Sequence, residues 1–218
     1  MQIALFTVAA ALIAGGGLLY HAIPPAVEAR AETSPVVARF EIDAQRSQFT
    51  VHAGRSGLLW FRGHDHFLAV RDFQGHVELA LDTLNPASLE MTVRADSLEE
   101  TGAVFTPQQK NIINREVDEI VLESTRYPEI TFRSTEVTGK MRNGQFDVKI
   151  KGDLSLHGVT KPIVIPAKVS LEADGLRAVG KFSIDRSDFN VKATNAFHGT
   201  VRVKNRLKFT FDIVARRV

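Results

Sequence analysis

The stretch QFDVKIKGDLSL, residues 145–156, decides the fold that we expect for this chain. Apolar residues occupy every second position, with Gly152 as the one interruption, and charged or polar residues stand between them. The apolar positions are Phe146, Val148, Ile150, Leu154 and Leu156. Because successive side chains of a strand point to opposite faces, this pattern predicts a strand with one face in a core and the other in water. Such strands are typical of antiparallel sheets.

The same alternation recurs along most of the chain after Pro35. In SLEMTVRAD, residues 88–96, the four apolar side chains share one face. The other alternating segments are HVELAL (76–81), EITFRS (129–134), PIVIPAKVSL (162–171) and TVRVKNRLKFTFDIV (200–214). The turn signals between segments are Asn85-Pro86, Asn143-Gly144 and Asp174-Gly175. We therefore expect an all-β fold of about eight or nine antiparallel strands, a number that suits a sandwich or a closed barrel.

One segment, residues 105–128, follows a helical pattern instead. Thr106 is a favoured N-cap, Pro107 suits the first helical position, and Gln109 completes a capping box. The apolar residues that then share one helical face are Ile113, Val117, Ile120 and Val121. The sequence therefore predicts one amphipathic helix within a chain of strands.

The N-terminal residues form a segment of their own. Residues 3–19 carry no charge, and Ala29-Arg30-Ala31 has the form of a signal-peptide cleavage site. Residues 3–23 also approach the roughly 20 apolar residues that a membrane span needs. The expected division is residues 1–31 as signal peptide or N-terminal membrane anchor, 32–38 as linker, and 39–218 as the domain built of strands. Either leader makes the protein periplasmic or otherwise extracytoplasmic, secreted or anchored, with residues 3–23 as its route to a membrane.

Composition narrows the classes of function. The chain has no cysteine, which excludes disulfides, thiol catalysis, iron–sulfur clusters and zinc ribbons. Its formal net charge is only +2, and no basic patch interleaved with aromatics is evident, so we expect no nucleic-acid partner. No nucleophile-elbow, zinc-protease or phosphate-loop motif occurs. We therefore predict no catalytic residues and expect a protein that is not an enzyme.

The sequence WFRGHDHF, residues 60–67, concentrates polar and aromatic side chains. On a strand, His64 and His66 would share one face and Asp65 would point away. Two imidazoles at this spacing could bind a metal only with a third or fourth protein ligand. The alternatives are a contact to the head group of a ligand and a polar patch with a structural role. We predict no metal ligands here.

Phenylalanine use is lopsided, with 14 Phe against 2 Tyr and 1 Trp. Those in the apolar phase of their strands are Phe49, Phe132, Phe146, Phe182, Phe209 and Phe211. An eight-stranded barrel is either filled by its side chains or holds one small ligand. Phenylalanine has no polar handle, so a cavity lined with it would favour an aliphatic or isoprenoid chain. The sequence leaves a filled and a hollow barrel as alternatives.

Four segments together resemble the YceI-like family of lipid- and polyisoprenoid-binding proteins. They are FEIDAQRSQFTVHA (40–53), YPEITFRSTEV (127–137), GDLSLHGVTKPIVIP (152–166) and IDRSDFNV (184–191). The chain departs from the family pattern at Asn190, where the family has glycine, and in its helix, which lacks the family's Arg-Asp-x-His-Leu element. It therefore looks like a divergent branch.

The resemblance implies an antiparallel eight-stranded lipocalin-like β-barrel with one helix, and a non-covalently bound isoprenoid or acyl lipid instead of any other cofactor. Polar residues at the mouth would meet a pyrophosphate, quinone or carboxylate head. The candidate ligand-binding residues are Phe49, Trp60, Arg62, His64, His66, Phe67, Phe132, Phe146, Phe182, Phe189 and Phe209.

The expected function is non-catalytic transport or sequestration of an amphiphilic lipid in the cell envelope, the lipid being a polyisoprenoid, an isoprenoid quinone or a fatty-acid-like chain. One alternative is a structural or stress-response envelope protein whose filled barrel acts through a protein partner. Another is a metal-dependent hydrolase built on His64 and His66. The sequence leaves open the identity of the lipid and the oligomeric state, a dimer included.

Overall fold

The computed structural model describes residues 36–57, 60–81, 84–192, 195–196 and 201–218. The expected signal or anchor segment and all but the last three residues of the expected linker lie outside this part of the chain. The described residues belong to one compact unit, Pro35–Val218. No helix within them is long and apolar enough to cross a membrane.

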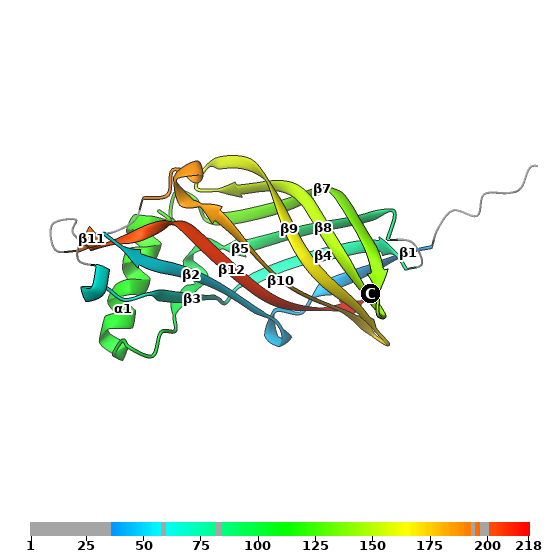
Figure 1. Cartoon of the computed structure of the whole chain (residues 1–218), viewed down its shortest axis with the longest axis horizontal. Coiled ribbons are helices and arrows are strands. Elements are labelled where there is room, and N and C mark those ends of the chain that lie inside the picture. Colours follow the sequence, from blue (N-terminus) through cyan, green and yellow to red (C-terminus); the bar gives the residue numbers. More distant parts are fainter. Residues whose placement is uncertain (1–35, 58–59, 82–83, 193–194, 197–200) are drawn as a thin grey trace, which may run out of the picture. The chain divides into compact units, whose positions relative to one another are not determined.

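Eight strands form a closed antiparallel barrel, which confirms the expected fold class (Figure 1). In the order in which they pair, the strands of the ring are β1 (Val37–Ile42), β4 (Phe73–Ala80), β5 (Ala87–Arg94), β7 (Glu129–Arg142), β8 (Gln145–Leu156), β9 (Val159–Glu172), β10 (Gly175–Asp185) and β12 (Val201–Arg217). Pairing of Phe40 with Arg217 and of Ile42 with Ala215 closes the ring between its first and last strands. Their apolar alternation is the reason that these segments form strands, because it supplies each with one face for the interior.

Three of these strands continue beyond short breaks. The continuations are β2 (Gln48–Ser56) after β1, β3 (His66–Val70) before β4, and β6 (Leu98–Glu100) after β5. They pair with one another and with β12, so they lengthen one side of the barrel wall. Short 3₁₀ turns mark two of the breaks, η1 (Ala44–Arg46) and η3 (Ala95–Ser97). Beyond β6 no further strand pairs within the described residues, so the wall is interrupted between β6 and the start of β7.

The predicted helix covers this interruption. It comprises α1 (Pro107–Glu116) and a π-helical turn, η4 (Val117–Val121). The expected capping box is present, because Thr106 Oγ1 accepts from the Gln109 N–H and Gln109 Oε1 accepts from the Thr106 N–H. Asn114 attaches the helix to the wall through its Oδ1, which lies 2.7 Å from the Glu100 backbone nitrogen. Figure 1 shows α1 at one end of the barrel, and the strand of the wall that it contacts most is β6.

The hairpin turns lie close to the predicted ones. Asn143 and Gly144 have φ angles of 49° and 77°, as the predicted two-residue turn requires. The prediction at Asp174-Gly175 was wrong by one residue, because Glu172 pairs with Gly175 and the turn is Ala173-Asp174. Gly175 instead lies in β10, where a Cβ atom would approach the carbonyl oxygen of Ala215 to 2.2 Å.

Two apolar clusters form in different parts of the barrel. One lies at the end with the β7–β8 and β9–β10 hairpins and closes it. Its buried residues are Ala38, Phe40, Leu79, Leu84, Phe146, Val148, Ala167, Val169, Leu176 and Ala215. The second cluster extends toward the helix end and includes Phe189 of the 3₁₀ turn η5 (Arg186–Phe189). Asn190 ends that turn with φ of 55°, which explains how asparagine stands where the resembled family has glycine.

Candidate ligand-binding cavity

The barrel is hollow. It encloses a cavity of about 810 Å³, lined by side chains from all eight ring strands, from β2, β3 and β6, and from the helix. Nearly all of this lining is apolar, and the apolar face of the helix forms one side of it through Ile113, Val117, Ile120 and Val121. A volume of this size is typical of pockets that hold a small organic ligand. The alternative of a filled barrel does not fit this interior.

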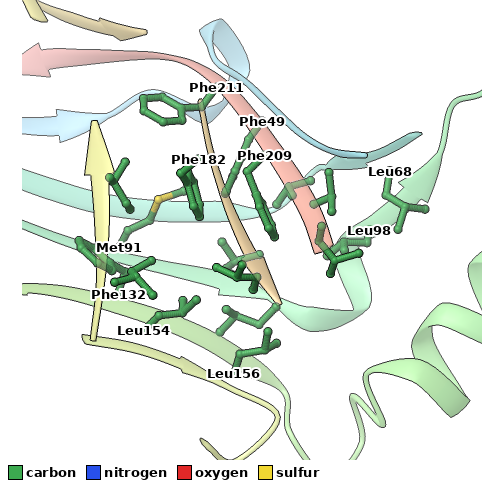
Figure 2. A pocket seen from close by; sticks show the side chains of 18 of the residues that line it. Phe49, Leu68, Met91, Leu98, Phe132, Leu154, Leu156, Phe182, Phe209 and Phe211 are labelled. Atoms are coloured by element: carbon green, nitrogen blue, oxygen red, sulfur yellow. The ribbon is translucent and has the colours of Figure 1, made fainter. Parts of the chain in front are cut away.

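Phenylalanine rings form one wall of the cavity. Phe182 of β10 stacks on Phe209 of β12 at 4.7 Å between ring centroids, and Phe49 of β2 lies 6.2 Å from Phe209. Figure 2 shows these three rings grouped with Phe211, while Phe132, Leu154 and Leu156 of β7 and β8 lie away from them. All the side chains that Figure 2 labels are apolar.

Seven of the predicted ligand-binding residues line this cavity. They are Phe49, Arg62, His64, His66, Phe132, Phe182 and Phe209. Trp60 begins the 3₁₀ turn η2 (Trp60–Arg62), but its side chain lies outside the described residues.

Three predicted residues do not line this cavity. Phe67 is on the outer face of β3, 41% exposed and stacked on His52 at 4.7 Å, because it alternates with the inward-facing Leu68. Phe146 belongs to the cluster that closes the hairpin end. Phe189 is only 1% exposed and packs in the core under η5 without lining the cavity.

Asp65, the central residue of the His-Asp-His sequence, is held by hydrogen bonds to β2. Its carboxylate points away from the cavity, with Oδ2 3.0 Å from His52 Nε2 and Oδ1 accepting from the Arg55 backbone N–H at 3.0 Å. The Arg55 N–H and then the His52 hydrogen bond hold the pKa of Asp65 below its usual range. This residue therefore connects β2 to the start of β3 and has a structural role.

His66 is bonded to a buried carboxylate. Its Nδ1 lies 2.8 Å from Oε2 of Glu100, whose side chain is fully buried, and its ring stacks on Phe105 at 5.2 Å. Glu100 also accepts from the backbone N–H groups of Gly102, at 2.7 Å, and Phe67, at 3.2 Å. Burial opposes ionisation of Glu100, but these three hydrogen bonds together outweigh it, so the pKa of Glu100 lies below its usual range. The pair joins β3 and β6 beside the cavity.

His64 contacts the same phenylalanine from a different direction. Its ring meets the edge of Phe105 at 5.6 Å and 83°. The described residues contain no group of three or more histidine, aspartate or glutamate side chains that could hold a metal ion. The geometry of this part of the chain therefore gives a cavity-facing imidazole, His64, beside a half-buried His66 that is bonded to the buried Glu100.

Four further charged residues line the cavity and were missed from the sequence. They are Glu116 of α1, Arg186 of η5, Lys192 after η5, and Arg202 of β12. Arg186 and Lys192 lie in or near a turn, where period-two alternation cannot assign an inside and an outside. Arg202 lies in the alternating segment 200–214, and the pattern placed it on the polar face, opposite Val203. Arg186 belongs to the segment IDRSDFNV, so that resemblance was the one signal in the sequence that could have singled it out.

Fold and cavity together define a class, the antiparallel β-barrels with a closed end, a helix at the other end and an apolar interior that can hold a ligand. Within that class, the chain belongs to the YceI-like domain family, whose sequence model matches residues 40–215. Protein YceI of Shigella flexneri is 31% identical over 171 residues, covering 73% of this chain and 79% of the relative. A UPF0312 protein of Pseudomonas fluorescens is 34% identical over 132 residues, covering 55% of this chain and 61% of that protein.

Solved structures agree with this fold. BcnA of Burkholderia cenocepacia superposes with a TM-score of 0.63 at 19% identity, covering 79% of this chain and 98% of that one. A polyisoprenoid binding domain from Saccharophagus degradans, implicated in plant cell wall breakdown, gives a TM-score of 0.57 at 15% identity over 84% of this chain and 100% of its own. At these identities the likeness concerns the fold.

Proposed function

We propose that this protein binds an amphiphilic lipid without chemical change and carries or sequesters it in the cell envelope. The lipid is a polyisoprenoid, an isoprenoid quinone or a fatty-acid-like chain, and its apolar part occupies the barrel. The observation that carries the proposal is the apolar cavity of about 810 Å³. The fold shared with a polyisoprenoid binding domain supports the same class of ligand.

The physical basis is burial of the apolar chain. Each CH₂ group moved from water into the cavity contributes about 0.8 kcal/mol, and ordering the flexible chain offsets part of this gain. Phe182 and Phe209 offer flat apolar faces and no competing polar atoms, so the interior favours hydrocarbon over any polar solute.

The proposed location is outside the cytoplasm. Residues 1–31 would act as a cleaved signal peptide or a membrane anchor, 32–38 as a linker, and 39–218 as the lipid-binding domain. The uncharged residues 3–19 and the cleavage-like sequence Ala29-Arg30-Ala31 support this division.

The direct test is mass spectrometry of an organic extract from the full-length protein, expressed with its own leader and purified after export. We expect one class of prenyl or acyl lipid at close to one molecule per chain. The proposal would be overturned if the folded protein carried no lipid and also took up none when it was incubated with solubilised prenyl and acyl lipids.

A further inference from the structure

The charged side chains at the cavity are unequal in sign. Those that line it among the described residues are Arg62, Arg186, Lys192 and Arg202 as cations and Glu116 as the single carboxylate. The imidazoles of His64 and His66 also line the cavity. The rest of the described lining is apolar apart from Ser88, Thr131 and Gly63, so this excess of positive charge borders a hydrocarbon-like interior.

The cations come together around the first residues of β12. Arg202 lies on that strand, and its carbonyl oxygen is 3.3 Å from Oγ of Ser56, at the end of the strand that leads to Arg62. The backbone N–H of Ser187, next to Arg186, donates to Oδ1 of Asn205 at 3.1 Å. Lys192 precedes β11 (Asn195–Ala196), which pairs with β12 at Arg202. Three segments far apart in the sequence thus bring their positive charges to one rim.

Two of the cations, Arg62 and Lys192, are not paired with the acids of the described residues. Glu100 is already bonded by His66 and two backbone N–H groups, and Asp65 by His52 and the Arg55 N–H. In the described part of the chain neither Arg62 nor Lys192 forms an ion pair with an acid within 4 Å.

Arg186 adds an independent observation. Its Nη1 donates to the carbonyl oxygen of Val191 at 2.8 Å, but its Nε is buried and has no hydrogen-bond partner among the described residues. A buried donor is normally paired, so this one, beside the cavity, is available to an acceptor group of a bound ligand.

From this arrangement we propose that the lipid held in the cavity has an anionic head, a phosphate, diphosphate or carboxylate, bound by Arg62, Arg186, Lys192 and Arg202. This inference rests on the proposed lipid-binding function and narrows its ligand class. Guanidinium groups bind phosphate and carboxylate oxygens in pairs of charge-assisted hydrogen bonds. A neutral quinone head would bring no negative charge to Arg62 and Lys192, whereas an anionic head could pair with both.

The test compares ligands that share one chain and differ in the head. Affinities of farnesyl diphosphate, farnesol and inorganic diphosphate are measured by calorimetry on the delipidated full chain. We expect farnesyl diphosphate to bind at least about ten-fold more tightly than farnesol, and the difference to shrink as salt concentration rises. In the double variant Arg62→Gln/Lys192→Gln, the ratio of the two affinities should fall about ten-fold.

A matched control removes the same charge elsewhere. Lys140→Gln/Lys149→Gln changes two exposed lysines of β7 and β8 that do not line the cavity, and it should preserve the ratio. The proposal of an anionic head would be overturned by equal affinity for farnesol and farnesyl diphosphate. It would also be overturned if both double variants lowered the affinity ratio alike. Either result would leave the proposed lipid binding intact. Inorganic diphosphate binding as tightly as farnesyl diphosphate would overturn it in favour of a free-anion site. Binding of neither farnesyl compound would instead count against the proposed function itself.

Discussion

Two glycines in equivalent hairpin turns make different demands on their surroundings. Gly144 and Gly158 each occupy the second position of a two-residue turn, with φ of 77° and 74°. A Cβ atom on Gly144 would meet nothing within 4 Å, whereas one on Gly158 would lie 2.7 Å from Cε1 of Tyr127. The first glycine is required by the backbone alone, and the second by the backbone and a packed ring.

This contrast gives a prediction for two alanine variants. Gly144→Ala should lower the free energy of unfolding by about 1 kcal/mol, the cost of placing a side chain at positive φ. Gly158→Ala should cost about 2–4 kcal/mol, because overpacking against Tyr127 is added to the same backbone term. Denaturant unfolding of both variants measures the difference. Equal losses would show that the Tyr127 contact relaxes freely.

The buried carboxylate of Glu100 predicts a pH dependence. Its pKa is lowered in the folded protein, so its ionised form favours folding above the unfolded-state pKa of about 4.3, and this contribution is lost as pH falls through the lower folded-state pKa. The free energy of unfolding should therefore decrease as the pH is lowered below that value. Glu100→Gln should reduce this loss of stability at low pH, the acid limb of the curve of unfolding free energy against pH. It should also lower the free energy of unfolding at neutral pH by about 1–3 kcal/mol.

The neighbouring acid Glu99 supplies the control. Its side chain is 55% exposed and pairs with Arg71 on the surface, so Glu99→Gln should leave the acid limb nearly unchanged. Urea unfolding at several pH values compares the two variants. If both flatten the curve equally, the dependence comes from general surface charge and not from the His66–Glu100 pair.

At the scale of elements, the capping box determines how firmly the helix covers the barrel. Gln109→Ala removes the side chain that accepts from the Thr106 N–H, while Gln108→Ala changes an exposed neighbour in the same turn. We expect the Gln109 variant to lose about 1 kcal/mol of stability and to exchange the first amide hydrogens of α1 faster, with little effect from the Gln108 variant. Hydrogen exchange is the measurement. Identical exchange in both variants would contradict a role for the cap.

The strand β3 shows that neighbouring residues of a strand face opposite sides of the barrel wall. His66 and Leu68 face the cavity, so Phe67 between them must face outward, where it stacks on His52. The aromatic character of Phe67 made it a candidate for the site, although the alternation rule alone places it on the other face. For a residue in a strand, its position in the alternation is therefore a better guide to cavity lining than its residue type.

At the scale of the whole molecule, lipid binding depends on empty volume. Leu154→Trp should place a bulky indole ring inside the cavity, whereas Val164→Trp adds the same ring to the exposed outer face of β9. We expect the Leu154 variant to lose most of its extractable lipid and the Val164 variant to keep it, with circular dichroism confirming that both are folded. Unchanged lipid content in the Leu154 variant would mean that the ligand lies outside the barrel.

The sequence alone determined the features that depend on neighbours along the chain. Period two in residues 145–156 identified a strand, and Thr106 with Gln109 identified the start of the helix, because a strand face and a cap are set by residues within a few positions of each other. The likeness of four segments to one family then led to the closed barrel, which the pairing of β1 with β12 confirms.

Only the tertiary structure decided the cavity and its charge. Whether a barrel is hollow depends on a small difference between the space inside the ring and the side chains that enter it, and no single strand contains that information. Arg62 and Arg202 belong to one rim although 140 positions separate them, because Ser56 and Arg202 are paired across β2 and β12. Local alternation says which residues share a face, but the pairing of distant strands decides which faces enclose a site.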